Sequence, residues 1–284
     1  MNPPPYQNQV AGKTNIVAIF EGHILKPTCA IEYNHYRTIS NVNPNLAKVL
    51  PFCCYVVQDG EVTPVHAAAC NRCSQNEEKI VEILGEVAPT GYHVLLYDYA
   101  YSMVSPRIVD LKLGHRTWGN DKTEEKKKEM AVKDAASTSA TMGIRLSGGV
   151  MTVNGVVQKL DKKSRGVFND YQLKEYLKKF FNIRNEQVIS AFSQTEKIRS
   201  AIKSSVGWHF IGASILFIID EAKEEPCDQV VVKLIDLAHT TSTLPVDEEN
   251  STCDQGAVFG LNQLSKILGE MIDATKWLRS LVVF

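Results

Sequence analysis

Hydrophobic and polar positions along this 284-residue chain follow two periods, which predict both strands and helices. Short apolar stretches bounded by Gly, Pro, Asn or Asp predict strands at 52–58, 94–98 and 106–114. Longer stretches with apolar positions three or four residues apart predict helices at about 170–181, 185–205 and 257–279, and we expect the charged segment 122–136 to be a helix as well. The segment 77–85 fits a short helix and a strand equally well.

Length and composition indicate a globular protein. A chain of 284 residues with 44% hydrophobic residues suits one large domain or two lobes with an ample core. The longest apolar runs, such as 52–57 and 215–219, are far too short to cross a bilayer. Residues 1–5 have neither a basic start nor an apolar stretch, so they do not predict a secretory signal. We therefore expect a cytosolic or nuclear protein.

The charges of the chain nearly balance. The formal net charge of −1 argues against a generally basic nucleic-acid-binding protein. A strongly anionic substrate would need a local cluster of Lys, Arg or His on this balanced surface.

Seven cysteines, an odd and scattered set, are typical of free thiols in an intracellular chain. Cys70 and Cys73 form one C-x-x-C pair, but a structural zinc site needs further ligands. The adjacent Cys53 and Cys54 have the wrong spacing for a second pair. We expect free thiols, and the role of the loop 59–76 stays open.

The stretch Pro106–Gly114 carries the first candidate chemistry. Asp110 and Lys112 lie two residues apart on a predicted strand, so both side chains leave the same face. A carboxylate there can orient or accept a hydroxyl proton, and an ammonium can neutralise the charge of a phosphoryl group. The alternative is a surface ion pair, which would contribute little to stability.

A second candidate is Asp236, which follows the apolar run Val230–Val232. An aspartate at the mouth of a buried strand is a usual magnesium ligand in phosphoryl transfer. The alternative is an aspartate that begins a turn.

Together these stretches resemble the inositol polyphosphate kinase family. Pro106–Gly114 keeps every fixed position of that family's P-x-x-x-D-x-K-x-G motif, and Ile235–Thr240 matches its I-D-F-A-H-T motif with Leu237 in place of Phe. Ser137–Arg145 is similar to S-T-S-A-T-L-G-V-R of the inositol hexakisphosphate kinases, the branch that the chain resembles most. Further segments similar to that branch are Gln9–Thr14, Lys26-Pro27 and 254–261.

The resemblance implies an α+β fold with two lobes, like that of protein kinases, and ATP between them. A small antiparallel-sheet lobe with the hinge would span 9–100, after a flexible N-terminus at 1–8. A larger mixed lobe with inserted helices would span 101–284 and hold the inositol phosphate and the metal. We expect a monomer.

The resemblance also implies roles on the nucleotide side. Lys26 would contact the ATP phosphates, with Glu32 as the partner that sets its position, and Asp98 would bind the ribose hydroxyls. Asp236 and Ser214 would hold Mg²⁺, although Ser214 is the one hydroxyl kept from a three-serine strand motif. The plain alternatives are a surface lysine at 26 and a linker aspartate at 98.

On the acceptor side, the resemblance implies that Asp110 and Lys112 are catalytic. The inositol phosphate would be bound by five cationic side chains, those of Lys112, Arg116, Lys126, Lys133 and His239. Lys126 and Lys133 lie seven residues apart, on one face of the predicted helix 122–136. The alternative is a solvated face on which lysines pair with neighbouring glutamates.

These residues imply MgATP-dependent transfer of the γ-phosphate to an inositol polyphosphate. The branch predicts inositol hexakisphosphate as the acceptor and a diphosphoinositol pentakisphosphate as the product. One alternative is a multikinase-like enzyme that phosphorylates a free hydroxyl of an inositol tris- or tetrakisphosphate. A second is a binding module that holds nucleotide or inositol phosphate with little or no turnover. The preferred acceptor and the position phosphorylated are left open by the sequence.

Overall fold

The fold comes from a computed structural model. It describes residues 3–12, 14–65, 70–119, 122–153, 156–160, 168–222, 230–242 and 252–272.

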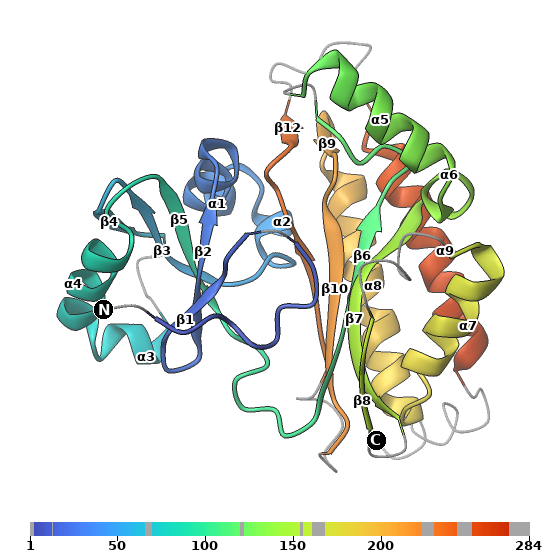
Figure 1. Cartoon of the computed structure of the whole chain (residues 1–284), viewed down its shortest axis with the longest axis horizontal. Coiled ribbons are helices and arrows are strands. Elements are labelled where there is room, and N and C mark those ends of the chain that lie inside the picture. The colour runs from blue at the N-terminus through green and yellow to red at the C-terminus, as the bar shows by residue number, and fades with distance from the viewer. Residues whose placement is uncertain are drawn as a thin grey trace.

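A five-stranded antiparallel sheet forms the smaller lobe, at the left of Figure 1. Its strands are β1 (Val17–Phe20), β2 (His23–Thr28), β3 (Cys53–Gln58), β4 (Glu61–Pro64) and β5 (Tyr92–Tyr97). The order in space is β1-β2-β5-β3-β4, so β5 lies in the middle of the sheet although it is the last of these five strands along the chain. Asp59 and Gly60 close the β3–β4 hairpin with φ of 49° and 83°, the backbone that an Asp-Gly turn favours.

Helices cover both faces of this sheet. They are α1 (Ala30–Val42), α2 (Pro44–Ala47), α3 (Asn71–Ser74) and α4 (Glu77–Val87). Tyr33 and Ile39 of α1 pack in the cluster that holds Val56, whereas Ile80 of α4 packs in the cluster that holds Val57. Because neighbouring strand residues face opposite ways, α1 and α4 lie on opposite faces.

A second five-stranded antiparallel sheet forms the larger lobe, in the order β11-β10-β6-β7-β8. Its strands are β6 (Pro106–Leu113), β7 (Ile144–Val153), β8 (Val156–Lys159), β10 (Ser214–Asp220) and β11 (Val230–Ile235). A two-stranded sheet pairs β9 (Trp208–Phe210) with β12 (Thr240–Ser242). The helices are α5 (Glu124–Ala135), α6 (Thr138–Met142), α7 (Asp170–Phe180), α8 (Asn185–Ser204) and α9 (Gln255–Met271).

The central strands of this sheet have one face toward the helices and one toward the small lobe. Leu111 of β6 and Phe217 of β10 pack with Leu177 of α7 and Leu264 of α9 in the main core. The alternate positions, among them Asp110, line the space between the lobes. This division places the functional side chains on the inner face, with the core as a rigid backing.

The two-lobed α+β fold that we predicted is confirmed. The unsettled segment 77–85 is helical, as α4. The lobe boundaries stay predictions, but residues 4–6 pair with β1 and the loop before it, where we expected a flexible end. Asn154-Gly155, a pair that favours a hairpin turn, lies outside the described residues, as do parts of the segments 221–229 and 242–256 and the end of the predicted helix 257–279. None of the described helices is both long and apolar enough to cross a membrane.

Candidate active site

Strand β6 presents Asp110 and Lys112 on the face toward the small lobe. Lys112 stands opposite Ser214 and Asp110 opposite Leu216 on the neighbouring strand β10. β11 completes this face, and Asp236 follows directly after it. Asp236 has φ of 64°, a left-handed conformation that Asp tolerates better than most residues. Residues far apart in the sequence thus meet because three adjacent strands carry them.

Lys26 of β2 bridges the two lobes. Its Nζ donates to Glu32 Oε1 at 2.9 Å and to Asp236 Oδ1 at 2.8 Å. Glu32 is 1% exposed and also accepts from the backbone amide of Leu237 at 3.1 Å. Burial lowers the pKa of Lys26, but Asp236 and Glu32 outweigh it and raise the pKa above its usual range. The ion pair that we predicted between Lys26 and Glu32 is present. Through its bond with the Leu237 amide, Glu32 also holds the segment after Asp236.

Asp110 is a buried acid beside a cation. It is 5% exposed, and burial raises its pKa to about 6 against the opposing effect of Lys112. Lys112 Nζ donates to Gly212 O at 2.9 Å and lies 4.0 Å from Asp236 Oδ2. A carboxyl group with a pKa near neutrality can exchange a proton with a substrate hydroxyl.

Oxygen donors suited to a divalent cation gather beside these lysines. Ser214 Oγ and Asp110 Oδ1 are buried without a hydrogen-bond partner among the described residues. Asp236 is 36% exposed at the cleft, and Lys26 and Lys112 lower its pKa against the effect of desolvation, so it is ionised. Carboxylate and hydroxyl oxygens fit Mg²⁺ or Mn²⁺, because these hard cations prefer oxygen ligands.

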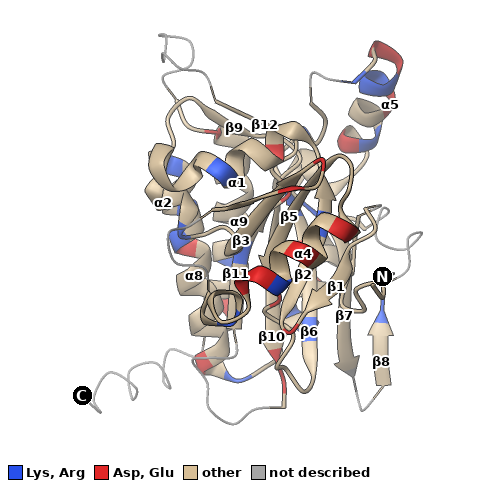
Figure 2. Ribbon diagram, turned by 90° about the vertical axis from the view of Figure 1, so that its left-hand side faces the viewer, with Lys and Arg blue, Asp and Glu red and all other residues tan. Residues whose placement is uncertain are grey.

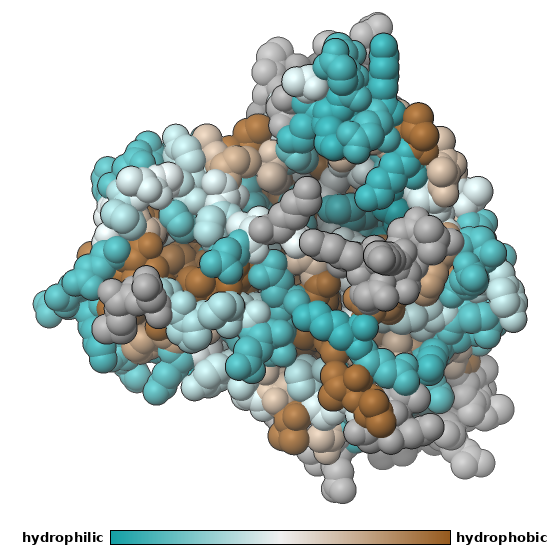
Figure 3. Space-filling view, viewed as in Figure 1, coloured by the Kyte–Doolittle hydropathy of each residue, from teal (hydrophilic) through white to brown (hydrophobic). Residues whose placement is uncertain are grey.

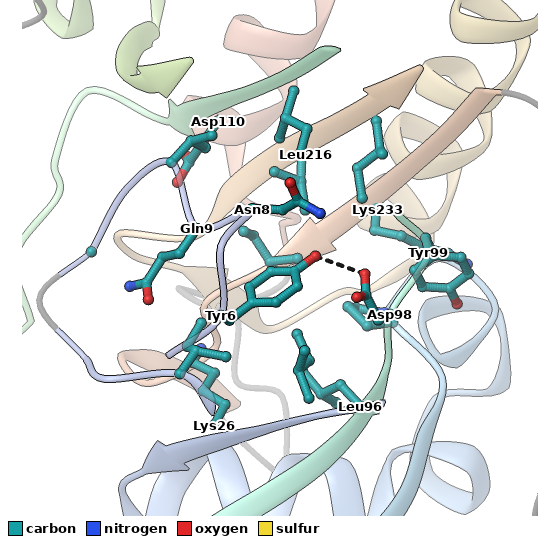
Figure 4. Close-up of a pocket in the computed structure, with 18 of the residues that line it drawn as sticks. Tyr6, Asn8, Gln9, Lys26, Leu96, Asp98, Tyr99, Asp110, Leu216 and Lys233 are labelled. Atoms are coloured by element: carbon teal, nitrogen blue, oxygen red, sulfur yellow. Dashed lines mark hydrogen bonds between the residues drawn. The ribbon is translucent and has the colours of Figure 1, made fainter. Parts of the chain in front are cut away.

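A cavity between the lobes adjoins this cluster (Figure 4). Its apolar walls include Ile24 and Leu96 from the small lobe and Leu216 and Ile218 from the large one. Asp98 lies at its hinge end, where it accepts hydrogen bonds from the Ala100 amide at 2.9 Å and the Tyr6 hydroxyl at 2.7 Å. An apolar slot with an acid at one end and Lys26 at the other suits a nucleotide base, ribose and phosphates.

A second hollow continues past Lys26 and Asp236. Thr14, Lys112, Gly212 and His239 line it, so its wall carries cationic and hydroxyl side chains. Gly212 has φ of 71°, and a Cβ there would stand 3.0 Å from the Thr117 carbonyl oxygen. Glycine is therefore required where the backbone passes this hollow.

The comparisons with known proteins agree with this geometry. A family model described as inositol polyphosphate kinase matches residues 93–269, which is more than half of the chain. The chain belongs to this family. It is thus an inositol polyphosphate kinase, a phosphotransferase.

Relatives of this kinase include multikinases and hexakisphosphate kinases. An inositol polyphosphate multikinase of Schizosaccharomyces pombe is 27% identical over 270 residues, which cover 90% of this chain and 93% of that protein. Inositol hexakisphosphate kinase 3 of Mus musculus is 29% identical over 201 residues, which cover 63% of this chain. The chain spans only 50% of the length of that second relative.

A solved structure shares the fold of this kinase. It is the crystal structure of the inositol phosphate multikinase Ipk2 from S. cerevisiae in complex with ADP and Mn²⁺. The TM-score is 0.66 at 16% sequence identity, covering 88% of this chain and 99% of that chain.

The predicted acceptor-binding residues of this kinase do not all lie together. Lys112 and His239 share the second hollow. Arg116 lies on the segment that follows β6 and stacks on Trp118, with Cζ 4.2 Å from the ring centroid. Lys126 is 51% exposed on α5 and pairs with Glu129 at 2.7 Å. Lys133 is also exposed on α5, a helix that stands apart from the two sheets in Figure 2.

The motifs of the sequence did not predict one buried network of polar side chains. Asp134 of α5 accepts from the Thr117 amide at 2.9 Å, the Thr117 hydroxyl at 2.7 Å and Arg145 at 2.7 Å. Ser137 caps α6 and also accepts from Arg145 at 3.3 Å. The match of Ser137–Arg145 to the family marked this segment as important. The structure shows that Arg145 and Ser137 belong to a network that holds the segment after β6.

Tyr6 was missed as well, because it belongs to a segment that we expected to be flexible. Its ring lies in the nucleotide-sized cavity and its hydroxyl donates to Asp98 (Figure 4). The predicted ribose partner therefore already has a hydrogen bond from the N-terminal segment.

Proposed function

We propose that this kinase transfers the γ-phosphoryl group of MgATP to a free hydroxyl of an inositol polyphosphate. The observation that carries this proposal is the Asp110 carboxyl, buried on β6 beside Lys112 with a pKa of about 6. A hydroxyl acceptor must lose its proton, and a base with a pKa near the working pH is effective at that step. The similarity to a multikinase over 93% of that protein's length supports the same acceptor class.

The chain's own residues divide the work. Lys26 binds the nucleotide phosphates from the small lobe, with Glu32 fixing its position through the 2.9 Å ion pair. Asp98 binds the ribose at the hinge end of the cavity. Asp110 accepts the hydroxyl proton, and Lys112 neutralises the charge that develops on the transferring group.

Asp236 and Ser214 hold Mg²⁺ in this proposal, with Asp110 beside them. The ion neutralises phosphate charge and orients the transferring group when it is bound with ATP. Lys26 keeps Asp236 ionised and oriented through the 2.8 Å contact.

The second hollow receives the acceptor, with Lys112 and His239 on its wall. The phosphates of the acceptor meet these cations, which supply the local positive charge that the net charge of −1 does not. We assign Lys126 and Lys133 to outer phosphates of larger acceptors. A cytosolic or nuclear monomer is part of the same proposal.

Inositol hexakisphosphate is the second candidate acceptor. The likeness of Ser137–Arg145 to the hexakisphosphate kinases and the 29% identity to one of them favour it. Thr138 and Ser139 of that segment are 2% and 0% exposed, so the likeness concerns a buried support and not an acceptor contact. We therefore place this acceptor second.

The deciding experiment incubates the full chain with MgATP and inositol phosphates that have or lack free hydroxyls, and separates the products by charge. We expect one phosphate to be added to tris- and tetrakisphosphates, at a rate that rises with pH through about 6 as Asp110 ionises. Asp110→Asn is the matched control and should be inactive on these acceptors. Product from the hexakisphosphate alone would reverse the order of the two acceptors, and no product from any acceptor would favour the binding module.

A further inference from the structure

Four metal-binding side chains meet in the small lobe, outside the active site. They are His23, Cys54, Cys70 and Cys73, whose ligand atoms all lie within 4.8 Å of one another. His23 begins β2, Cys54 lies on β3, and the other two belong to α3 and the residue before it. His23, Cys54 and Cys73 are at most 1% exposed, and Cys70 is partly exposed.

The cluster faces away from the nucleotide cavity. His23 and Leu25 of β2 point toward the side of the sheet that α4 covers, whereas Ile24 and Lys26 point toward the cavity. The alternation of side chains along β2 therefore separates the two sites. Nothing assigned to phosphoryl transfer uses these four residues.

The distances within the cluster fit a tetrahedral ion. His23 Nε2 lies 3.2 Å from Cys70 Sγ, 3.3 Å from Cys73 Sγ and 3.5 Å from Cys54 Sγ. A zinc ion with bonds of about 2.3 Å to sulfur and about 2.0 Å to nitrogen separates nitrogen from sulfur by about 3.5 Å. The side chains are thus already spaced for a central ion.

The other ring nitrogen of His23 fixes the direction of this ligand. Nδ1 lies 3.0 Å from the backbone carbonyl of Glu21, which can only accept, so Nδ1 is the protonated nitrogen. Nε2 then carries a lone pair, which three sulfur atoms approach. One lone pair satisfies one thiol, whereas a shared cation satisfies all four groups. A carbonyl behind a histidine is also the usual support of a metal ligand.

We propose that His23, Cys54, Cys70 and Cys73 bind one Zn²⁺ ion as a structural site. Thiolate and imidazole ligands favour zinc over the oxygen-seeking cations of the active site. Four protein ligands leave no position open for a substrate, which is the mark of a structural site. Three thiolates exceed the charge of Zn²⁺ by one, and Arg72, which lies between Cys70 and Cys73 in the sequence, adds a positive charge to this segment.

The ion would join three separate pieces of the small lobe. α3 has four residues, too few to be stable alone, and two ligands belong to this segment. His23 follows Gly22, whose carbonyl accepts from the Asp98 amide at 2.8 Å. Zinc would therefore hold α3 against the sheet and support the strand end that positions Asp98.

The structure describes six of the seven cysteines and shows all six as free thiols, as the sequence predicted. Cys70 and Cys73 do lack a second C-x-x-C pair, but Cys54 and His23 complete the set from two strands. Their sequence separations from the pair follow no motif spacing, because the sheet and not a loop brings them together.

The test is the metal content of the full chain, produced with zinc in the medium and separated from loosely bound metal by gel filtration. We expect about one zinc per chain, and Cys70→Ser and Cys73→Ser should retain less than about a tenth of it. Cys53→Ser is the matched control, since Cys53 is buried next to Cys54 but its thiol donates to the Tyr55 carbonyl. This variant should keep its zinc.

Replacement of zinc by Co²⁺ in the wild-type chain gives a second readout that needs no variant. We expect thiolate-to-cobalt charge-transfer absorption and the ligand-field bands of a tetrahedral ion. A wild-type chain without zinc that also gives no such spectrum would overturn the proposal. Iron in place of zinc, a Cys70–Cys73 disulfide, or equal zinc in Cys70→Ser and wild type would overturn it as well. Neither readout depends on kinase activity.

Discussion

At the residue scale, burial sets the chemistry of Asp110. Its pKa is raised from 3.8 to about 6, so the folded state binds a proton more tightly than the unfolded state does. The stabilising contribution of the protonated acid is complete below about pH 4 and is lost as the pH rises through about 6. At neutral pH the ionised Asp110 therefore lowers the free energy of unfolding. The protein retains this destabilising acid for its function.

We predict that Asp110→Asn abolishes phosphorylation and stabilises the ligand-free chain. An uncharged amide avoids the cost of a buried carboxylate, so the gain is about 3 kcal/mol at pH 8 and about half of that at pH 5. Urea unfolding of wild type and variant at both pH values measures it. An equal effect of the substitution at pH 5 and pH 8 would show that Asp110 does not titrate in this range.

A second residue-scale prediction concerns Lys26. Lys26→Met should raise the KM for ATP by about tenfold to a hundredfold, because a charge-assisted contact is lost, and change the KM for the acceptor little. The buried Glu32 loses its cation, so unfolding should also become easier by about 3–5 kcal/mol. Steady-state kinetics below the new Tm separate the two effects. Unchanged ATP kinetics in the folded variant would make Lys26 a purely structural residue.

At the element scale, two glycines bring helix α9 against the active-site strand. Gly143, with φ of 61°, ends α6, and its carbonyl accepts from the Gly114 amide at 2.8 Å. A Cβ on Gly260 of α9 would stand 2.1 Å from that same carbonyl oxygen. Backbone contact between α9 and this turn thus fixes the end of β6.

We predict that Gly260→Ala destabilises the chain by about 1–3 kcal/mol or more, since backbone must move to admit the methyl group. Gly269→Ala is the control in the same helix, where the nearest atom to the new Cβ is 4.0 Å away. That substitution should stabilise the helix by about 0.5–1 kcal/mol. Chemical denaturation compares the two, and equal effects would contradict the close approach.

Across the whole molecule, positive and negative charges nearly balance, so an anionic acceptor must be bound by a local group of cations. The net charge is −1, whereas a hexakisphosphate carries about a dozen negative charges when each monoester holds −1.5 to −2. Hydrophilic residues gather over α5 at the top of Figure 3. In our proposal, exposed lysines of α5 such as Lys126 and Lys133 attract large acceptors through the solvent.

We predict that Lys126→Ala combined with Lys133→Ala raises the KM for the most highly phosphorylated acceptor that the chain turns over and leaves kcat nearly unchanged. The increase should shrink as salt rises, because exposed charges are screened. Lys178→Ala is the control, since Lys178 is 52% exposed and pairs with Glu175 as Lys126 does with Glu129. A KM that does not move at low salt would place this face of α5 in plain solvent.

The main strands and helices of the large lobe and the family could be predicted from the sequence, but not whether 77–85 is a helix or a strand. Alternating and 3.6-residue patterns are local, so β6, α7 and α8 could be read from them within a few residues. The spacing of Asp110 and Lys112 placed both on one face, because strand geometry has a fixed period of two. The motifs around Asp110 and Asp236 also named the chemistry.

Which distant residues meet depends on the tertiary structure and could not be predicted from the sequence. Lys26 contacts Asp236, which lies 210 positions further along the chain. His23 and Cys54 lie beside the Cys70–Cys73 pair because of how β2, β3 and α3 pack. The structure also placed Tyr6 in the cavity and buried the Asp134–Arg145 network. Such contacts depend on packing between elements, and the periodicity of one element carries no information about the face that another presents to it.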